Sequence, residues 1–286
     1  MRVIEWRYRD QLDWRLVVVG LSEDTSRYAS HGYTPLRMAS GHLRFRDRYG
    51  MPFASEPKSG LSASSPACRA IVSARLHYPG SEWRVFRALQ LANFNQGLLF
   101  DDSDAMLRVL SGVPGIDAGE VLGAIDAPEV IAEYERDKAE TRTAEGSATE
   151  LQGKAGNSDG KVRYTAPSVV FETSDGRRLE AGGFQPVEAY DVLVCNLDPT
   201  LDRREPPETP APLLEYFDGG LSTQEVAALM TRGNDAPDRM AAEAALIELV
   251  GNGEAVRQPL GDDALWLSAS SPALENASGA FATARS

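Results

Sequence analysis

Cysteine is scarce in this chain, and its spacing disfavours two kinds of site. The 286 residues include two cysteines, Cys68 and Cys195, and no C-x-x-C pair. This spacing suggests neither a disulfide framework nor a zinc site. The three histidines, His31, His42 and His77, also lack metal-ligand spacing, so we expect no metal and no cofactor.

Each of the two cysteines has an expected environment. Cys195 falls on the expected apolar side of a helix, where a buried thiol behaves as a small hydrophobic group. Cys68 follows Ser65-Pro66-Ala67 in the first turn of a predicted helix, where the helix dipole favours a thiolate. Ordinary packing is the simpler interpretation for both.

Long hydrophobic runs and excess positive charge are also missing. No apolar run approaches the roughly 20 residues that span a bilayer, and the first residues turn polar too soon for a signal peptide. The net charge of −13 disfavours phosphate backbones and anionic membranes as partners. We therefore expect a cytoplasmic protein with no membrane and no nucleic-acid partner.

The most informative stretch is residues 162–171, an apolar strand entered through Thr165-Ala166-Pro167. Proline has no N–H to donate within a central strand, so Pro167 belongs at a strand entrance or edge. A turn at 174–177, a return run at 178–181 and a Gly-Gly-Phe turn at 182–184 follow. A predicted helix from about 186 to 197 completes the order.

This order resembles the second half of a thioredoxin fold, and the helical segment before it is similar to the insert of the DsbA-like branch. That branch includes disulfide oxidoreductases and glutathione-dependent hydroxychromene-carboxylate isomerases. The resemblance covers roughly residues 1–200 and implies an α/β fold, with a thioredoxin-like sheet and a long all-helical insert at about 61–155. It implies thiol–disulfide or glutathione-type chemistry on a protein or small-molecule thiol substrate. The backbone of Thr165 or Ala166, beside Pro167, would bind an extended substrate chain by strand addition.

The beginning of the chain departs from this family. Residues 2–11 predict a helix, and residues 12–21 predict a strand buried on both faces, because Trp14, Leu16 and Val18 alternate with further valines. The strand and C-x-x-C that should come first are absent, so no catalytic residue is assigned. We favour a truncated oxidoreductase whose redox site lies upstream of Met1. The alternative is a catalytically inactive thioredoxin-fold protein that serves as a binding module or scaffold.

Residues 61–155 predict a run of helices, and residues 22–60, which lead into them, are assigned no elements. In relatives this region borders the active-site groove, so His31, Asn93 and Gln96 are candidate substrate-binding residues. The basic and aromatic run at 44–49 is interpreted as a solvated helix face with local ion pairs. The acidic residues at 101–104 are interpreted as helix caps, and a last long helix is expected to reach about Lys154.

The composition changes after residue 200. Residues 201–212 form a proline-rich linker, and residues 213–267 predict two helices and a hairpin, which resemble a small α+β winged-helix module. Residues 201–267 contain 5 basic and 13 acidic residues, so we expect a packing or homodimerisation module rather than a DNA reader. The Ala/Ser-rich residues 268–286 are expected to be disordered.

Overall fold

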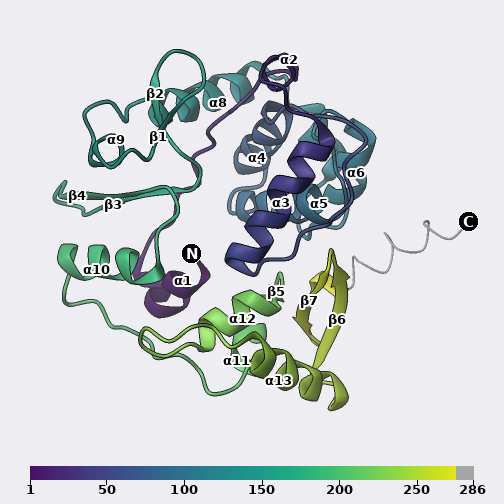
Figure 1. Cartoon of the computed structure of the whole chain (residues 1–286), viewed down its shortest axis with the longest axis vertical. Coiled ribbons are helices and arrows are strands. Elements are labelled where there is room, and N and C mark those ends of the chain that lie inside the picture. The colour runs from purple at the N-terminus through teal and green to yellow at the C-terminus, as the bar shows by residue number, and fades with distance from the viewer. Residues whose placement is uncertain (275–286) are drawn as a thin grey trace, which may run out of the picture. The chain divides into compact units, whose positions relative to one another are not determined.

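The computed structural model describes residues 1–274. Its chain divides into two compact units, each made from two separate segments (Figure 1). Unit 1 comprises Met1–Leu21 and Ala132–Pro206, and unit 2 comprises Ser22–Ile131 and Pro207–Ser286. The chain passes from unit 1 to unit 2 for the last time between Pro206 and Pro207, inside the expected linker at 201–212. The expected domain boundaries themselves stay a prediction.

Unit 1 combines helices with two antiparallel hairpins. Its helical elements are α1 (Arg2–Tyr8), the 3₁₀ turn η1 (Arg9–Gln11), most of α8 (Pro128–Thr141), α9 (Ala148–Leu151) and α10 (Val187–Leu197). Its strands are β1 (Ala155–Asn157), β2 (Val162–Tyr164), β3 (Ser168–Glu172) and β4 (Arg178–Gly182). β1 pairs with β2, and β3 pairs with β4. The β3–β4 hairpin runs beside α10 (Figure 1).

The core of unit 1 lies between α1, the β3–β4 hairpin and α10. α10 faces it with Tyr190, Val194 and Leu197, whose spacing places them on one side of a helix. Ile4 and Tyr8 face it from α1. Cys195 does not join this face. The expectation that its thiol is buried was wrong, because Cys195 follows Val194 around the helix and is exposed.

The strand expected at residues 12–21 is absent. This segment is irregular because side chains of α8 and of Arg142, the residue that follows α8, satisfy its backbone in place of a neighbouring strand. The Val18 N–H donates to Asp137 Oδ2 at 3.0 Å, and Arg142 donates to the carbonyl oxygens of Val19 and Gly20. Gly20 has a φ of 58°, and a Cβ there would lie 2.3 Å from the Tyr134 hydroxyl oxygen.

Helix α8 also ends earlier than expected. It stops at Thr141 rather than near Lys154. Gly146 takes a left-handed φ of 74°, and the Ser147 side chain accepts a hydrogen bond from Glu150 N to begin the short α9. Position 146 therefore needs a glycine, and the chain turns there instead of continuing as one helix.

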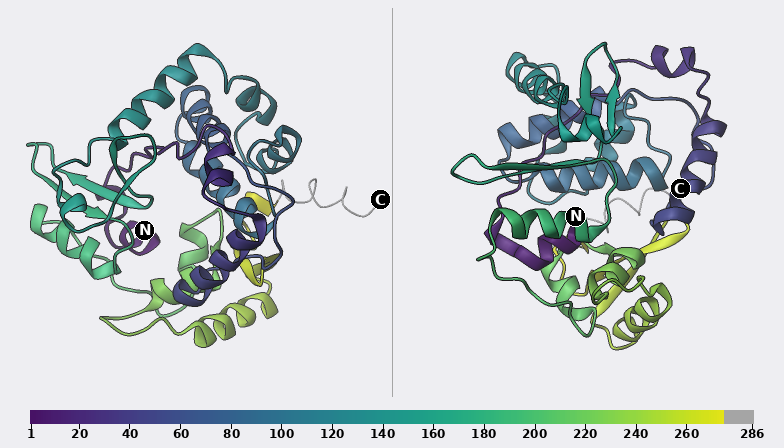
Figure 2. Two further views of the ribbon diagram at one scale, coloured as in Figure 1. Left: turned by 45° about the horizontal axis from the view of Figure 1, so that its top comes forward. Right: turned by 60° about the vertical axis from the view of Figure 1, so that its left-hand side comes forward.

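Unit 2 consists mainly of helices. From its first segment come α2 (Ser26–Ser30), α3 (Pro35–Tyr49), α4 (Ser65–His77), α5 (Glu82–Asn95), α6 (Ser103–Leu110) and α7 (Ala118–Gly123). Its second segment adds α11 (Ala211–Tyr216), β5 (Leu221–Ser222), α12 (Thr223–Met230), α13 (Arg239–Gly251), β6 (Ala255–Leu260) and β7 (Asp263–Ser268). The strands form an antiparallel sheet in the order β5-β7-β6, and α12 packs on α13 (Figure 2). The chain is therefore a mixed α/β protein with small antiparallel sheets.

Side-chain caps begin α6 and α12 of unit 2, whereas α4 and α5 begin without a side-chain cap hydrogen bond. Ser222 and Glu225 form a capping box at the start of α12. Asp102 caps α6 by accepting a hydrogen bond from Ala105 N at 2.9 Å, in agreement with the structural interpretation of the acidic run at 101–104. The expectation that residues 268–274 are disordered was wrong, because Ser268 ends β7 and the buried Ser271 donates to Asp218 O at 2.6 Å. The rest of the expected disordered tail, 275–286, lies outside the described residues.

Ion pairs join the two segments of unit 2 across long stretches of sequence. Arg87 of α5 donates to both carboxylate oxygens of Glu225 on α12, at 2.9 and 2.7 Å, and to Gly220 O at 3.1 Å. Both side chains are largely buried. A paired and buried carboxylate of this kind holds α12 on α5 with a fixed geometry.

Candidate functional site

Thr165, Ala166 and Pro167 link β2 to β3 in unit 1. The Thr165 hydroxyl donates to Lys154 O at 2.7 Å, and Thr165 O accepts a hydrogen bond from the Ser168 hydroxyl at 2.6 Å. The Ala166–Pro167 peptide bond is cis. Ala166 and Pro167 are exposed. The three predicted substrate-binding residues of this unit thus form one short surface segment with a fixed conformation.

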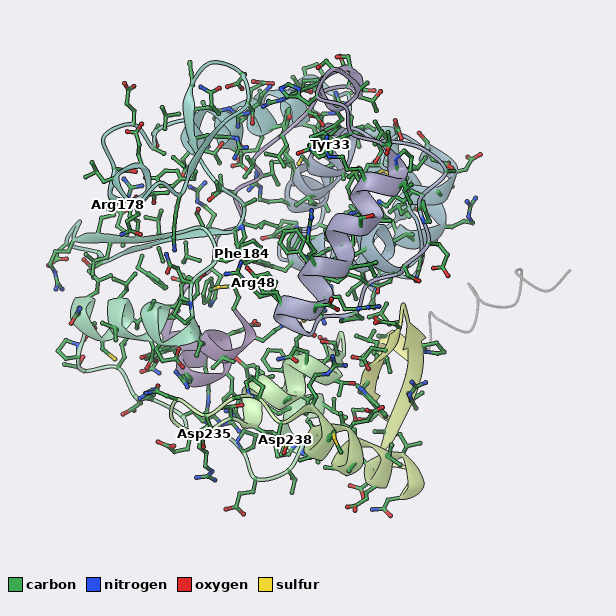
Figure 3. All side chains as sticks on the ribbon, in the orientation of Figure 1. Tyr33, Arg48, Arg178, Phe184, Asp235 and Asp238 are labelled. Carbon is green, nitrogen blue, oxygen red and sulfur yellow. The ribbon has the colours of Figure 1, made fainter. Side chains whose placement is uncertain are left out.

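An exposed phenylalanine lies at the same end of the β3–β4 hairpin. Ser168 pairs with Gly182 in the hairpin register, and Gly183 N donates to the Ser168 hydroxyl at 3.2 Å. Phe184 follows with half of its surface exposed (50%). Figure 3 labels Phe184 at this end of the hairpin and Arg178 toward the other. We call Ala166, Pro167 and Phe184 the Phe184 patch.

Lys154 links the two chain segments that form the Phe184 patch. Its ammonium donates to Phe184 O at 3.3 Å, while its own carbonyl accepts from the Thr165 hydroxyl. A Cβ at Gly183, which has a φ of 67°, would lie 3.5 Å from both the Lys154 side chain and the Thr165 hydroxyl oxygen. Sequence reasoning identified the Gly-Gly-Phe turn as structural and missed Phe184 as a surface group. The sequence signal for Phe184 was a large apolar side chain placed just beyond the end of a strand.

The outer edge of β3 adds backbone groups beside this patch. Among the strands of residues 1–274, β3 pairs with β4 alone. Val170 on β3 is also exposed (38%). An unpaired strand edge presents N–H and C=O groups that can add another extended chain. The patch and this edge are contiguous in the chain through Ser168.

A buried charge cluster stabilises α10 behind the hairpin. Asp191 accepts from the Tyr8 hydroxyl at 2.8 Å and pairs with Arg7 at 3.3 Å and Arg203 at 2.6 Å. Burial, followed by hydrogen bonds to Cys195 and Asp191, raises the pKa of Tyr8 well above its ordinary value. The cluster therefore binds α1 and the chain after α10 together, with Tyr8 protonated.

The two cysteines belong to separate units, and neither forms a disulfide within residues 1–274. Cys195 lies in unit 1, where its sulfur is 3.3 Å from the Tyr8 hydroxyl oxygen, and Cys68 lies half-buried on α4 of unit 2. Both are free cysteines. Disulfide exchange needs a reactive thiolate and a second thiol that resolves the mixed disulfide. Within residues 1–274, no group of three or more acidic, cysteine and histidine side chains has the arrangement of a metal site.

The other predicted binding residues belong to unit 2. His31 follows α2 and is exposed, with Nδ1 2.8 Å from Arg27 O. Gln96 follows α5 and is also exposed. Asn93 lies on α5, where its side-chain oxygen accepts a hydrogen bond from Lys58. No hydrogen bond in the described part of the chain joins these three side chains to one another.

The partner of Asn93 is a lysine that sequence reasoning missed. The Lys58 ammonium also donates to Leu98 O at 2.9 Å and lies 5.9 Å from the centre of the Phe100 ring. Burial lowers its pKa to about 8. His42 packs against Phe53 and Phe94 with ring centres 5.5 and 5.3 Å away, and burial, then the charge of Lys58, lower its pKa.

The space beside Lys58 is too small for a substrate. The cavity lined by His42, Glu56 and Lys58 has a volume of about 10 Å³. A volume of that size holds at most a single water molecule. Lys58 and Asn93 therefore form a partly buried polar contact within unit 2. The sequence signal was an isolated lysine in a segment otherwise rich in small residues and proline.

Comparison with models of known protein families finds no match, and comparison with curated proteins finds none either. In the described residues, no helix has both the length and the apolarity needed to cross a bilayer.

Proposed function

We propose that the chain is a DsbA-like protein of the thiol–disulfide class, in which the Phe184 patch and the edge of β3 bind an extended substrate chain. The observation that carries this proposal is the exposed Phe184 beside the free strand edge. An extended peptide placed there would gain backbone hydrogen bonds from β3 and an apolar contact from Phe184. The order of elements from β2 to α10 supports the same family, because it is the order expected for the second half of a thioredoxin fold.

The thiol chemistry of this proposal depends on a dithiol that these residues do not supply. Cys68 and Cys195 belong to different units and neither is part of a C-x-x-C sequence. The chain alone is therefore expected to bind substrate without oxidising it. A second candidate function follows from the same observation: a binding module or scaffold that uses the Phe184 patch and carries out no redox step.

The second segment of unit 2 has a separate proposed role. Its elements follow the order α11-β5-α12-α13-β6-β7, and this order with the sheet β5-β7-β6 resembles a winged helix. Its excess of acidic residues opposes DNA binding, since a DNA reader needs a basic recognition helix. Glu225 is also already paired with Arg87. We propose that the module packs within unit 2.

Peptide binding tests the proposed surface. Fluorescence anisotropy of a labelled, reduced and extended apolar peptide should show saturable binding to the chain. Phe184→Ala should weaken that binding about tenfold, the loss typical of a central apolar contact. Val192→Ala is the matched control, because Val192 is also an exposed apolar residue of unit 1 (54%) but lies on α10. Equal affinities of the two variants would reject the patch.

A redox assay separates the two candidate functions. Reduction of insulin by dithiothreitol should proceed at the uncatalysed rate in the presence of this chain. The same assay on a form carrying a C-x-x-C segment upstream of Met1 should be accelerated if the protein is an oxidoreductase. If peptide binding is retained but both forms are inert, the binding-module interpretation holds and the redox proposal fails.

A further inference from the structure

A larger cavity in unit 2 is lined by side chains whose net charge is opposite in sign to that of the whole chain. It has a volume of about 460 Å³ and lies between the end of α3, the starts of α12 and α13, and the β6–β7 turn. Arg46, Arg48 and Arg239 line it together with Asp47 and Asp262. These side chains carry a net charge of +1 at neutral pH, whereas the chain carries −13.

Two of the three guanidinium groups are fixed by the fold. Arg46 donates to Asp262 Oδ2 at 3.1 Å, and Asp262 Oδ1 in turn accepts from Phe53 N at 3.1 Å. Arg239 donates to Gly50 O at 2.9 Å and to Asp263 Oδ2 at 3.0 Å. A guanidinium has five N–H donors, so both groups keep donors available for a ligand while their positions stay fixed.

The carboxylate that holds Arg239 is itself firmly placed. The side chain of Asp263 is buried (5% exposed) and accepts from the Thr223 hydroxyl at 2.7 Å. That hydroxyl accepts from the indole N–H of the buried Trp266 at 2.9 Å. The network therefore positions one wall of the cavity before any ligand arrives, which lowers the entropic cost of binding.

Arg48 is the uncommitted cation of this cavity. It is exposed at the C-terminal end of α3, where Figure 3 labels it, and it forms no ion pair within residues 1–274. Its guanidinium lies 5.3 Å from the centre of the Tyr49 ring, and the Phe45 ring stacks on Tyr49 at 5.9 Å. The interpretation of residues 44–49 as a face with local ion pairs is thus incomplete, because Arg46 also pairs with the distant Asp262.

We infer that this cavity binds a small organic anion that carries a carboxylate or phosphate group. The three arginines provide the planar, charged donors that suit both groups. The volume falls within the range of ligand pockets, about 300–1,000 Å³, and far exceeds the space of a single inorganic ion. The Tyr49 ring supplies an apolar surface for the rest of the ligand. This site is separate from the Phe184 patch and does not depend on the proposed function.

Isothermal titration calorimetry with two probes tests the inference and separates the two chemistries. Pyrophosphate and citrate are each titrated at constant ionic strength up to about 10 mM, with sodium chloride as reference. Saturable binding of either probe is expected, and the probe that binds more tightly assigns the anionic group. The inference is overturned if neither probe gives a saturable signal beyond that of chloride.

Matched variants locate the binding. Arg48→Glu should weaken the preferred probe about tenfold or more, because it removes a charge-assisted contact. Arg44→Glu is the control, because Arg44 is also exposed on α3 and changes the net charge equally, but does not line the cavity. Arg48→Lys should retain part of the affinity. Equal weakening by the two glutamate variants would indicate a general charge effect and reject the site.

Discussion

Lys58 shows how burial decides the behaviour of a single ionisable residue. Its ammonium has two neutral oxygen acceptors, from Asn93 and Leu98, and burial lowers its pKa from the ordinary 10.5 to about 8. The folded protein therefore releases this proton at a lower pH than the unfolded chain. Between about pH 8 and 10.5 the unfolded chain binds more protons at this site, so the contribution of Lys58 to stability rises with pH.

At the scale of single residues, we predict that the difference in unfolding free energy between the wild-type protein and Lys58→Met changes with pH. Relative to Lys58→Met, the wild-type protein should gain about 1 kcal/mol of unfolding free energy from pH 7 to pH 10, because partial solvent contact screens part of the shift. Urea unfolding at several pH values measures it, and His42 and Glu56, which line the same cavity, are present in both proteins. Lys161→Met, at an exposed lysine, should show no such gain. A constant difference for Lys58→Met across the range would contradict the prediction.

At the scale of elements, the segment before Ser22 depends on α8. Arg142 is almost fully buried (5% exposed) and donates to Val19 O and Gly20 O, while it also pairs with Asp159 at 2.9 Å. Arg142→Ala would leave two carbonyl groups without their donor and Asp159 without its partner. The expected loss of unfolding free energy is about 2–4 kcal/mol.

Hydrogen exchange and urea unfolding check this prediction. In Arg142→Ala, the amide of Val18 should exchange faster as residues 12–21 separate from α8. The control is Arg136→Ala on α8, whose side chain is exposed (72%) and pairs with nearby Glu133. Its effect should stay within about 0.5 kcal/mol. Similar losses in both variants would show that Arg142 does not hold the segment.

The same elements show which features sequence patterns could predict. Local signals predicted the β6–β7 hairpin and the helices of unit 2 that follow residue 60, because each depends on residues close together in the chain. The strand at 12–21 was predicted wrongly, because alternation describes an extended segment but cannot say what satisfies its backbone. Here the partners are Asp137 and Arg142, more than a hundred residues away.

Only part of the candidate site could likewise be predicted from the sequence. The position of Thr165, Ala166 and Pro167 before a strand could be predicted from proline chemistry alone. The roles of Phe184 and Lys58 could not, since exposure and burial depend on tertiary packing. The arginine cavity combines residues from α3, α12, α13 and the β6–β7 turn, so no local pattern contains it.

At the scale of the whole chain, unit 2 is held together by contacts between its two segments. Cleavage at a protease site inserted between the exposed Glu208 and Thr209 would break the covalent connection between these segments. We expect residues 209–286 to remain bound, because Arg87 pairs with Glu225 and Arg46 with Asp262 across the cut. Size-exclusion chromatography should show one native peak, and denaturant should separate the fragments.

A variant tests the basis of that association. Arg87→Ala removes the guanidinium that pairs with the largely buried Glu225 and should cause the cleaved fragments to separate at a lower urea concentration. Arg232→Ala, at an exposed arginine with a long 3.8 Å ion pair to Glu208, should not. Free dissociation of the cleaved wild-type protein in buffer would show instead that residues 213–267 behave as an independent domain.

The interleaved order of the two units has a consequence for synthesis on the ribosome. The helices α2 to α7 emerge first, but their partners α11 to α13 follow only after residues 132–206 have been translated. During that interval the surface of α2 to α7 that will later contact the second segment, including Arg46 and Arg87, remains exposed. A ribosome-bound chain that has passed residue 206 but not residue 268 is therefore the stage at which we expect chaperones to engage this protein.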